Sequence, residues 1–396
     1  MKRIFVNYQR PGTLDYFLIG LVFLAVIIFC FLNPAFSFPD TNTYLKAHIY
    51  RFPGYIYFLR GLRYIFSENY EWAVVAFQLF FGLSAVFVTH RKLSKLFHLG
   101  FVLKLLFLGV LVFPFFNPLL VANKLVSEGL AYPLYLLLIT YSLELLFTSK
   151  TKSIISVVGY FILLVLTRGQ FIVAAPILLF MVLLKYRKSI FQLKNMAIFL
   201  IILFLPITTN LLDRLHRSAV YGYFETTPFS YVNAITLPLF VSKKDNANVL
   251  ETETQKEIFR LTHRRMDSMG LLSSEAGETV RDQYLLFHNN FPQICNQNFH
   301  EQGREFLYTL NKTPYWSSIQ IEKESKEMFP KLMDANFSNW LSIYVYGIKH
   351  GFKTWWILAF VIGVFIFSFI QSVRRSDETF EFLFFASSLL LSNAMV

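Results

Sequence analysis

The sequence predicts an all-α integral membrane protein. We expect a polytopic helix bundle of about nine spans, with surface helices in the first outer loop and a small, mostly helical extramembrane domain. The chain of 396 residues is 55% hydrophobic and only 16% charged, whereas a soluble domain is about 25% charged. It contains 46 Phe, and its apolar residues stand in long runs. These observations argue against a water-soluble globule and against a disordered chain.

Apolar runs near the length that crosses a bilayer, roughly 20 residues, occur in nine places. The predicted spans are 16–32, 71–89, 100–118, 129–147, 153–166, 171–184, 195–212, 353–372 and 380–396. The first lacks a small-residue cleavage site after it, so we interpret it as a retained anchor. The fifth and sixth are short and flank Arg168. The alternative is one span with Arg168 at its centre, which would place a cation in the hydrocarbon at a cost of several kcal/mol.

The distribution of basic residues decides between these alternatives. If the N-terminus, with Lys2, Arg3 and Arg10, is cytoplasmic, nine spans put every short basic loop on that side, as the positive-inside rule requires. These loops contain Arg91, Lys92, Lys95, Lys150, Lys152, Lys185, Arg187, Lys188, Lys194, Arg374 and Arg375. A single span over 153–184 would move the loop from Lys185 to Lys194 and the pair Arg374-Arg375 outside. The charges therefore favour two short helices with Arg168 at the outer surface.

This topology divides the chain into three parts. Residues 1–212 form a membrane bundle with a first outer loop at 33–70, residues 213–352 an outer domain, and residues 353–396 C-terminal membrane helices. Because the last apolar run breaks off at Val396, we expect the chain to be truncated. The outer domain has nearly equal numbers of acidic and basic residues, with helical periodicity at 251–269 and 316–332. The net charge of +12 thus follows largely from topology, and no nucleic-acid partner is indicated.

The first outer loop contains the most informative polar residues. We expect a helix over 41–50, a break at Pro53-Gly54 and a second helix to about Phe66, both along the membrane surface. Asp40 stands at the mouth of the first helix. It is interpreted either as an N-cap or as a general base held at the membrane surface. The two roles are compatible, because one carboxylate oxygen can cap the helix while the other faces a substrate.

Cations on the outer side are unexpected under the positive-inside rule. Arg51, Arg60 and Arg63 either extend to lipid head groups or recognise a phosphate at the interface. Arg168 either satisfies carbonyls at a helix turn or takes part in function.

Two further ionisable residues open the fourth span. Lys124 and Glu128 have the i,i+4 spacing of a pair on one helix face. Alternatively they face a cavity, as ionisable groups at the top of a span usually do. Glu128 would then be a second acid beside Asp40.

No metal centre is predicted. The sequence has no HExxH motif and no Cys/His spacing of a zinc site. The two cysteines, Cys30 and Cys295, are not expected to pair. Asp40 has no Asp two residues away, so the first loop holds no close carboxylate pair. We expect no essential metal and no cofactor.

Several short motifs resemble those of bacterial GT-C glycosyltransferases, the relatives of protein O-mannosyltransferases and of the lipid A aminoarabinose transferase. The resemblance covers roughly residues 15–212, and Gly169 stands where the family has Pro. Its motifs are Pro39-Asp40-Thr41 with Tyr44, Arg51-Phe52-Pro53-Gly54-Tyr55, Ser127-Glu128 and Thr167-Arg168.

The resemblance implies transfer of one sugar, with inversion, from a polyprenyl-phosphate carrier to an acceptor at the outer face of a bacterial inner membrane. Asp40 would take the acceptor proton, and Glu128 would assist. The basic residues assigned to the lipid phosphate are Arg51, Arg60, Arg63, Lys124 and Arg168. The partners would be the lipid-linked donor, membrane lipids and an acceptor that the sequence does not identify.

Two other functions remain open. An oligosaccharide polymerase or ligase would also use lipid-linked sugars, but such proteins place their key residues in a large late loop, whereas here they cluster in the first loop and before the fourth span. A transporter or flippase would show polar midspan residues or Gly/Pro breaks in symmetric halves, and the nine runs show no halves.

Overall fold

The computed structural model describes residues 13–392, except residues 149, 151 and 376. The N-terminal basic residues Lys2, Arg3 and Arg10 therefore lie outside the described residues, as do positions 393–396 of the last predicted span. Within the described part the protein is helical, and Phe36 and Lys124 form an isolated parallel β-bridge.

Six of the described helical stretches are long and apolar enough to cross a membrane, which fits a polytopic integral membrane protein. They are Leu14–Leu32, Pro53–Leu96, Glu128–Thr148, Gly169–Tyr186, Leu193–Tyr221 and Trp355–Arg374. Shorter apolar helices are present at Phe101–Phe115, Ser153–Thr167 and Ser230–Val241.

The chain forms two compact units. The first comprises the described residues up to Asp213 together with Phe365–Ser392, and the second comprises Arg214–Val364. The first unit contains α1 (Thr13–Leu32), α2 (Pro39–Leu45), α3 (Pro53–Phe66), α4 (Tyr70–Leu96), α5 (Phe101–Val112), α6 (Glu128–Thr148), α7 (Ser153–Thr167), α8 (Ala174–Tyr186), most of α9 (Leu193–Tyr221), the later part of α17 (Trp355–Arg374) and α18 (Glu378–Ser392).

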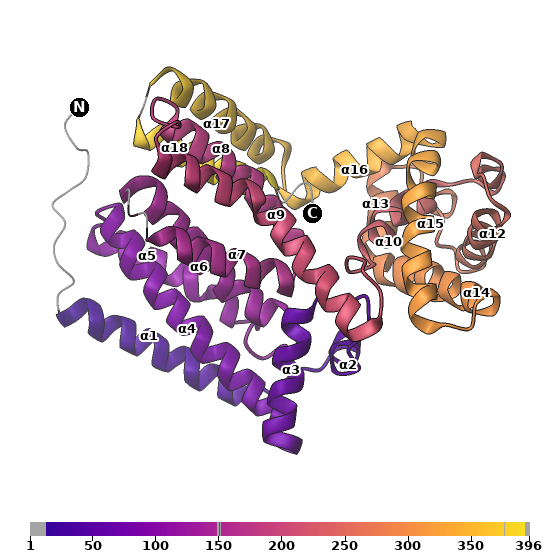
Figure 1. The fold of residues 1–396 in the computed structure, drawn as a ribbon, viewed down its shortest axis with the longest axis horizontal. Helices are drawn as coiled ribbons and strands as arrows, with labels where there is room; N and C mark the ends of the chain where they lie inside the picture. The colour runs from indigo at the N-terminus through magenta and orange to yellow at the C-terminus, as the bar shows by residue number, and fades with distance from the viewer. Residues whose placement is uncertain (1–12, 149, 151, 376, 393–396) are drawn as a thin grey trace. The chain divides into compact units, whose positions relative to one another are not determined.

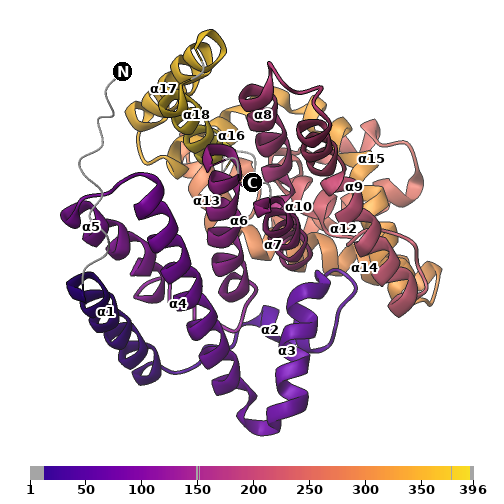
Figure 2. The ribbon, with the colours of Figure 1, turned by 60° about the vertical axis from the view of Figure 1, so that its left-hand side comes forward.

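Helices α4, α6 and α7 form the centre of the first unit. Figures 1 and 2 show α4 between α1 and α5 on one side and α6 on the other. Only four residues separate α6 from α7, and the two helices pack closely. They therefore form an antiparallel hairpin. Its core is fully buried and apolar, with Leu138, Val157, Phe161 and Leu164 among its members.

Each of the nine predicted spans overlaps a described helix, but the end of the third differs. The third prediction, 100–118, is wrong beyond Val112, where α5 ends. Pro114 lacks the N–H that an α-helix needs, and residues 113–115 form a short 3-10 helix, η2. The chain breaks at Arg168, which has extended backbone between α7 and the 3-10 helix η3 (Gly169–Val173). A single continuous helix through Arg168 is thereby excluded.

The second unit is also helical. Its helices are α10 (Ser230–Ala234), α11 (Thr236–Val241), α12 (Glu253–Ser268), α13 (Val280–Pro292), α14 (Gln302–Leu310), α15 (Pro314–Ala335) and α16 (Phe337–Gly351). Helices α12 and α15 occur where the periodicity predicts them. Ile258, Phe299 and Met328 belong to its buried core.

Candidate functional site

The first loop is held against the segment that precedes α6. Phe36 N–H donates to the carbonyl of Asn123 (2.8 Å), and Leu125 N–H donates to the carbonyl of Phe36 (2.9 Å). The buried amide of Asn123 donates to the carbonyls of Cys30 (2.8 Å) and Asn33 (3.1 Å). Two non-helical segments about 90 residues apart in sequence are thus fixed side by side by hydrogen bonds.

A second set of hydrogen bonds fixes α2 and α3 at the same place. The buried hydroxyl of Thr41 donates to the carbonyl of Leu125 (2.8 Å). The hydroxyl of Tyr55 donates to the amide oxygen of Gln78 (3.1 Å), whose nitrogen donates to the carbonyls of Ala122 (2.8 Å) and Lys124 (3.1 Å). Since buried polar groups are costly without partners, these bonds determine where α2 and α3 lie against α4 and the segment before α6.

Asp40 and Arg51 form an ion pair across the turn between α2 and α3. The guanidinium also donates through Nε to the hydroxyl of Thr43 (2.8 Å) and lies over the rings of Tyr44 and Tyr50, 5.0 and 5.6 Å from their centroids. The side chain of Asp40 is 49% exposed, whereas that of Arg51 is 16% exposed. The carboxylate therefore faces outward with the cation behind it.

The second acid, Glu128, pairs with Arg168 at the open end of the α6–α7 hairpin. Their Oε1 and Nη1 atoms lie 2.5 Å apart. Arg168 also donates to the hydroxyl of Ser127 (3.4 Å) and to the side-chain oxygen of Gln170 (3.3 Å). Glu128 is 54% exposed and Arg168 is 26% exposed. The exposure pattern of the first pair is thus repeated here.

Tyr44 connects the two ion pairs. The Arg51 guanidinium lies 5.0 Å from the centroid of its buried ring, and the Ser127 side chain and the charges of Arg51, Asp40 and Glu128 all affect the pKa of its phenol. Burial raises the pKa of the Tyr44 phenol above its ordinary value, and the positive charge of Arg51 opposes that shift. The phenol therefore stays protonated at neutral pH and can donate a hydrogen bond.

Two glycines allow the close packing behind this cluster. A Cβ atom at Gly54, the second residue of α3, would lie 2.6 Å from Thr167 Oγ1 and 2.9 Å from the Leu166 carbonyl oxygen. A Cβ atom at Gly169 would lie 2.1 Å from the Phe52 ring. This contact gives a physical reason for glycine at position 169, since any side chain there would meet the Phe52 ring.

Two details of the predicted first loop are wrong. Asp40 is not an N-cap, because α2 begins at Pro39 and Phe38 precedes it. The first helix ends at Leu45 rather than near Tyr50. Ala47 has φ of +49°, and the hydrogen bonds from Ala47 N–H to Tyr44 O and from His48 N–H to Thr43 O form a Schellman-type stop.

The helical i,i+4 pair of Lys124 and Glu128 is also wrong. Lys124 lies before α6, in the bridge with Phe36, so the two residues share no helix face. Its ammonium group donates to the carbonyl of Pro118 (3.3 Å) and lies 5.9 Å from the centroid of the Phe38 ring.

Arg60 and Arg63 do not join the two ion pairs. Both lie on the exposed face of α3, and Arg63 stacks over Tyr70 at 5.7 Å. In the part of the chain that the structure describes, neither arginine forms a salt bridge, and neither does Lys124.

Sequence reasoning missed the residues that hold the cluster together. In the sequence, Gln78 and Asn123 are polar residues in or beside apolar runs. Tyr44 is interpreted there as an aromatic residue of the membrane interface. A buried amide within a span is a usable signal, because an amide in an apolar setting needs partners. As for metals, no three His, Cys, Asp or Glu side chains among the described residues are grouped so as to hold an ion, and Cys30 and Cys295 are free.

The sequence matches no known protein family, no curated protein and no solved structure. The resemblance to GT-C glycosyltransferases therefore depends on the short motifs alone. Chemically, the cluster presents two half-exposed carboxylates, each backed by a guanidinium and joined through one phenol.

Proposed function

We propose that this protein is a glycosyltransferase that moves a sugar from a polyprenyl-phosphate carrier to an acceptor hydroxyl at the outer face of the membrane. The observation that carries the proposal is the grouping of Asp40, Arg51, Glu128 and Arg168 around Tyr44. These residues come from three separate stretches of sequence. Exposed surface ion pairs contribute little to stability, so fold stability alone is a weak explanation for joining two of them at one place.

In the proposed reaction, Asp40 accepts the proton of the acceptor hydroxyl as its oxygen attacks the anomeric carbon. The bond between that carbon and the phosphate oxygen breaks, and the electron pair leaves with the polyprenyl phosphate. A positioned general base accelerates such a step by about 10²–10⁴-fold. Arg51 orients the carboxylate, which the turn between α2 and α3 presents to solvent.

The departing phosphate needs cations, because negative charge develops on it as the bond breaks. Arg51 and Arg168 already pair with carboxylates. We therefore assign the phosphate first to Lys124, Arg60 and Arg63, for which the described part of the chain offers no carboxylate partner. Arg51 and Arg168 position the two acids in this scheme.

The position of the cluster along the bundle supports an outer-face reaction. Glu128 begins α6 and Glu144 lies 16 residues later, which corresponds to about 24 Å along a helix. Lys92 and Lys150 pair with Glu144, so the basic loop residues lie at the end of α6 opposite the cluster. Because basic loops face the cytoplasm, the cluster belongs on the outer side, with the N-terminus inside.

The test is sugar transfer by the full chain in liposomes. The probes are polyprenyl-phosphate hexoses, pentoses and aminosugars, with extracted envelope glycolipids as acceptors, and the released polyprenyl phosphate is quantified by chromatography. We expect release from at least one donor and a loss of about 10²–10⁴-fold in Asp40→Asn. The control is Glu68→Gln, an exposed acid in the 3-10 helix η1 (Ser67–Asn69). Release from no donor, or full activity in Asp40→Asn, contradicts the proposal.

A further inference from the structure

A cleft of about 910 Å³ lies at the basic end of the first unit, lined by residues of α1, α4 and α6 and by the segment after α6. A second cleft of about 550 Å³ shares four of its lining residues: Lys92, Tyr141, Glu144 and Lys150. The larger volume is within the range of pockets that hold small ligands. It is independent of the cluster around Tyr44, since none of that cluster's residues lines it.

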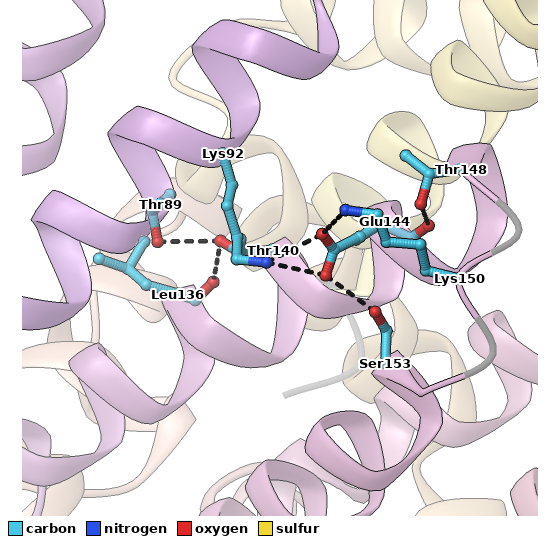
Figure 3. Close-up of polar contacts among 8 residues, drawn as sticks. All are labelled: Thr89, Lys92, Leu136, Thr140, Glu144, Thr148, Lys150 and Ser153. Carbon is cyan, nitrogen blue, oxygen red and sulfur yellow. Dashed lines mark hydrogen bonds and ion pairs between the residues drawn. The ribbon is translucent and has the colours of Figure 1, made fainter.

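The carboxylate of Glu144 pairs with two of the lysines that line this cleft, Lys92 and Lys150, as Figure 3 shows. Glu144 accepts from the ammonium of Lys92 at 2.8 and 2.9 Å, from Lys150 at 3.1 Å and from the hydroxyl of Ser153 at 2.8 Å. Its side chain is only 12% exposed. Lys92 also lies 4.5 Å from the centroid of the Tyr141 ring. Glu144 therefore holds Lys92 between α4 and α6, while Lys150, whose side chain is 66% exposed, pairs with the same carboxylate from the segment after α6.

The lining carries an excess of positive charge. Arg91, Lys92, Lys95 and Lys150 contribute cations, and Glu144 is the one carboxylate among the lining residues. Arg91 and Lys95 are exposed, and within the described residues neither forms a salt bridge. The smaller cleft adds Lys152. A site with this balance attracts an anion.

The same cleft has apolar walls. Phe87, Val88, Leu93 and Leu96 alternate with the cations along α4. An anion that fits both kinds of surface carries a charged group and an apolar part. The positive-inside rule accounts for basic residues in loops, but it does not require two lysines fixed on a shielded glutamate beside an apolar cleft.

We propose that this cleft binds the phosphate of an anionic lipid head group in the inner leaflet. Arg91 and Lys95 contact the phosphate, Lys92 and Lys150 supply fixed positive charge, and the apolar wall of α4 packs against the first acyl carbons. The chemistry recognised is a phosphate ester whose negative charge no cation in the same head group neutralises, and a soluble phosphate is the other possible source of it. This inference does not depend on the proposed transferase activity.

The experiment measures binding of short-chain lipids to the full chain in neutral detergent. The probes are dioctanoyl-phosphatidylglycerol, which carries a net negative charge, and dioctanoyl-phosphatidylcholine, which does not. We expect the anionic lipid to bind more tightly. The double variant Arg91→Gln/Lys95→Gln should weaken that binding about thirtyfold, because each surface cation contributes a several-fold effect. The charge-conserving variant Arg91→Lys/Lys95→Arg should keep it within about threefold.

The matched control is Lys188→Gln/Lys194→Gln, which removes two exposed cations outside the cleft, one after α8 and one in the first turn of α9. We expect unchanged binding there. Equal affinity for both lipids, or an equal loss in the control, would overturn the proposal. Displacement of the lipid by inorganic phosphate at similar concentration would also overturn it, since the source would then be a soluble anion.

Discussion

The guanidinium of Arg168 lies 2.5 Å from the carboxylate of Glu128, across the open end of the α6–α7 hairpin. One partner is the first residue of α6, and the other directly follows the last residue of α7. The pair therefore holds the two helix ends together where Tyr44 contacts Ser127. Its contribution to stability and its contribution to activity can be measured separately.

We expect the Glu128–Arg168 pair to contribute little to stability and more to function. Because Glu128 is more than half exposed, solvent screening limits its coupling with Arg168 to about 1 kcal/mol or less. The measurement is a double-mutant cycle with Glu128→Gln and Arg168→Gln. The melting temperature and the rate of sugar transfer are measured for the wild type, each single variant and the double variant. We expect each single variant to lose transfer by at least about tenfold. A pair that only stabilises the fold would change unfolding and transfer in proportion.

The two close-packed glycines should tolerate alanine to different degrees. At Gly54 the new methyl meets the backbone carbonyl of Leu166, which cannot move without shifting α7, whereas at Gly169 it meets the tip of the Phe52 ring. Overpacking of this kind costs about 1–3 kcal/mol. We expect Gly54→Ala to lower the melting temperature more than Gly169→Ala, and Phe52→Ala to restore stability to Gly169→Ala.

The control for both is Gly159→Ala. Gly159 lies inside α7 with no atom within 4 Å of its added Cβ. Alanine there should be neutral or stabilise by up to about 1 kcal/mol. Equal melting temperatures for all three alanine variants would show that α3 does not pack tightly against the end of α7.

How much was predictable from sequence depends on the range of the interactions. The span positions follow from the lengths of apolar runs, and the break at Arg168 follows from the cost of a central cation. The end of α2 was mispredicted because Ala47, not Gly, takes the left-handed conformation that stops it. The partners of Asp40 and Glu128 depend on a loop held by Asn123 and Gln78. No local pattern encodes such distant contacts.

The second unit should lose stability in mild acid because of His263 in α12. Burial is the largest cause that lowers the pKa of His263 below its ordinary value, while the Ser242 backbone and Asp267 oppose it and Lys244 adds to it. Nε2 is buried without a hydrogen-bond partner among the described residues. The folded state therefore binds a proton less readily than the unfolded state, and stability declines as pH falls below about 6.5.

The measurement is hydrogen exchange of α12 peptides in the full chain, corrected for intrinsic rates, at about pH 7.5 and about pH 5.5, on either side of the ordinary histidine pKa. We expect protection to fall at the lower pH. The variant His263→Gln cannot titrate, so its protection should change less between the two conditions. An identical pH response in the variant would assign the effect to other groups.

Cysteine labelling should place the two ends of the bundle on opposite sides of the membrane. Cys30 and Cys295 are buried, and after their replacement by alanine, single cysteines are introduced at the half-exposed Asp40 and at the exposed Lys188 and Lys312. With basic loops inside, an impermeant maleimide added to intact cells should label positions 40 and 312 but label 188 only after permeabilisation. Because the candidate span Gly169–Tyr186 separates Arg168 from Lys188, labelling of 40 and 188 from the same side would contradict the nine-span topology. Labelling of position 40 only after permeabilisation would make an outer-face transfer reaction at Asp40 untenable, since its acceptor and its lipid-linked donor would face the wrong compartment.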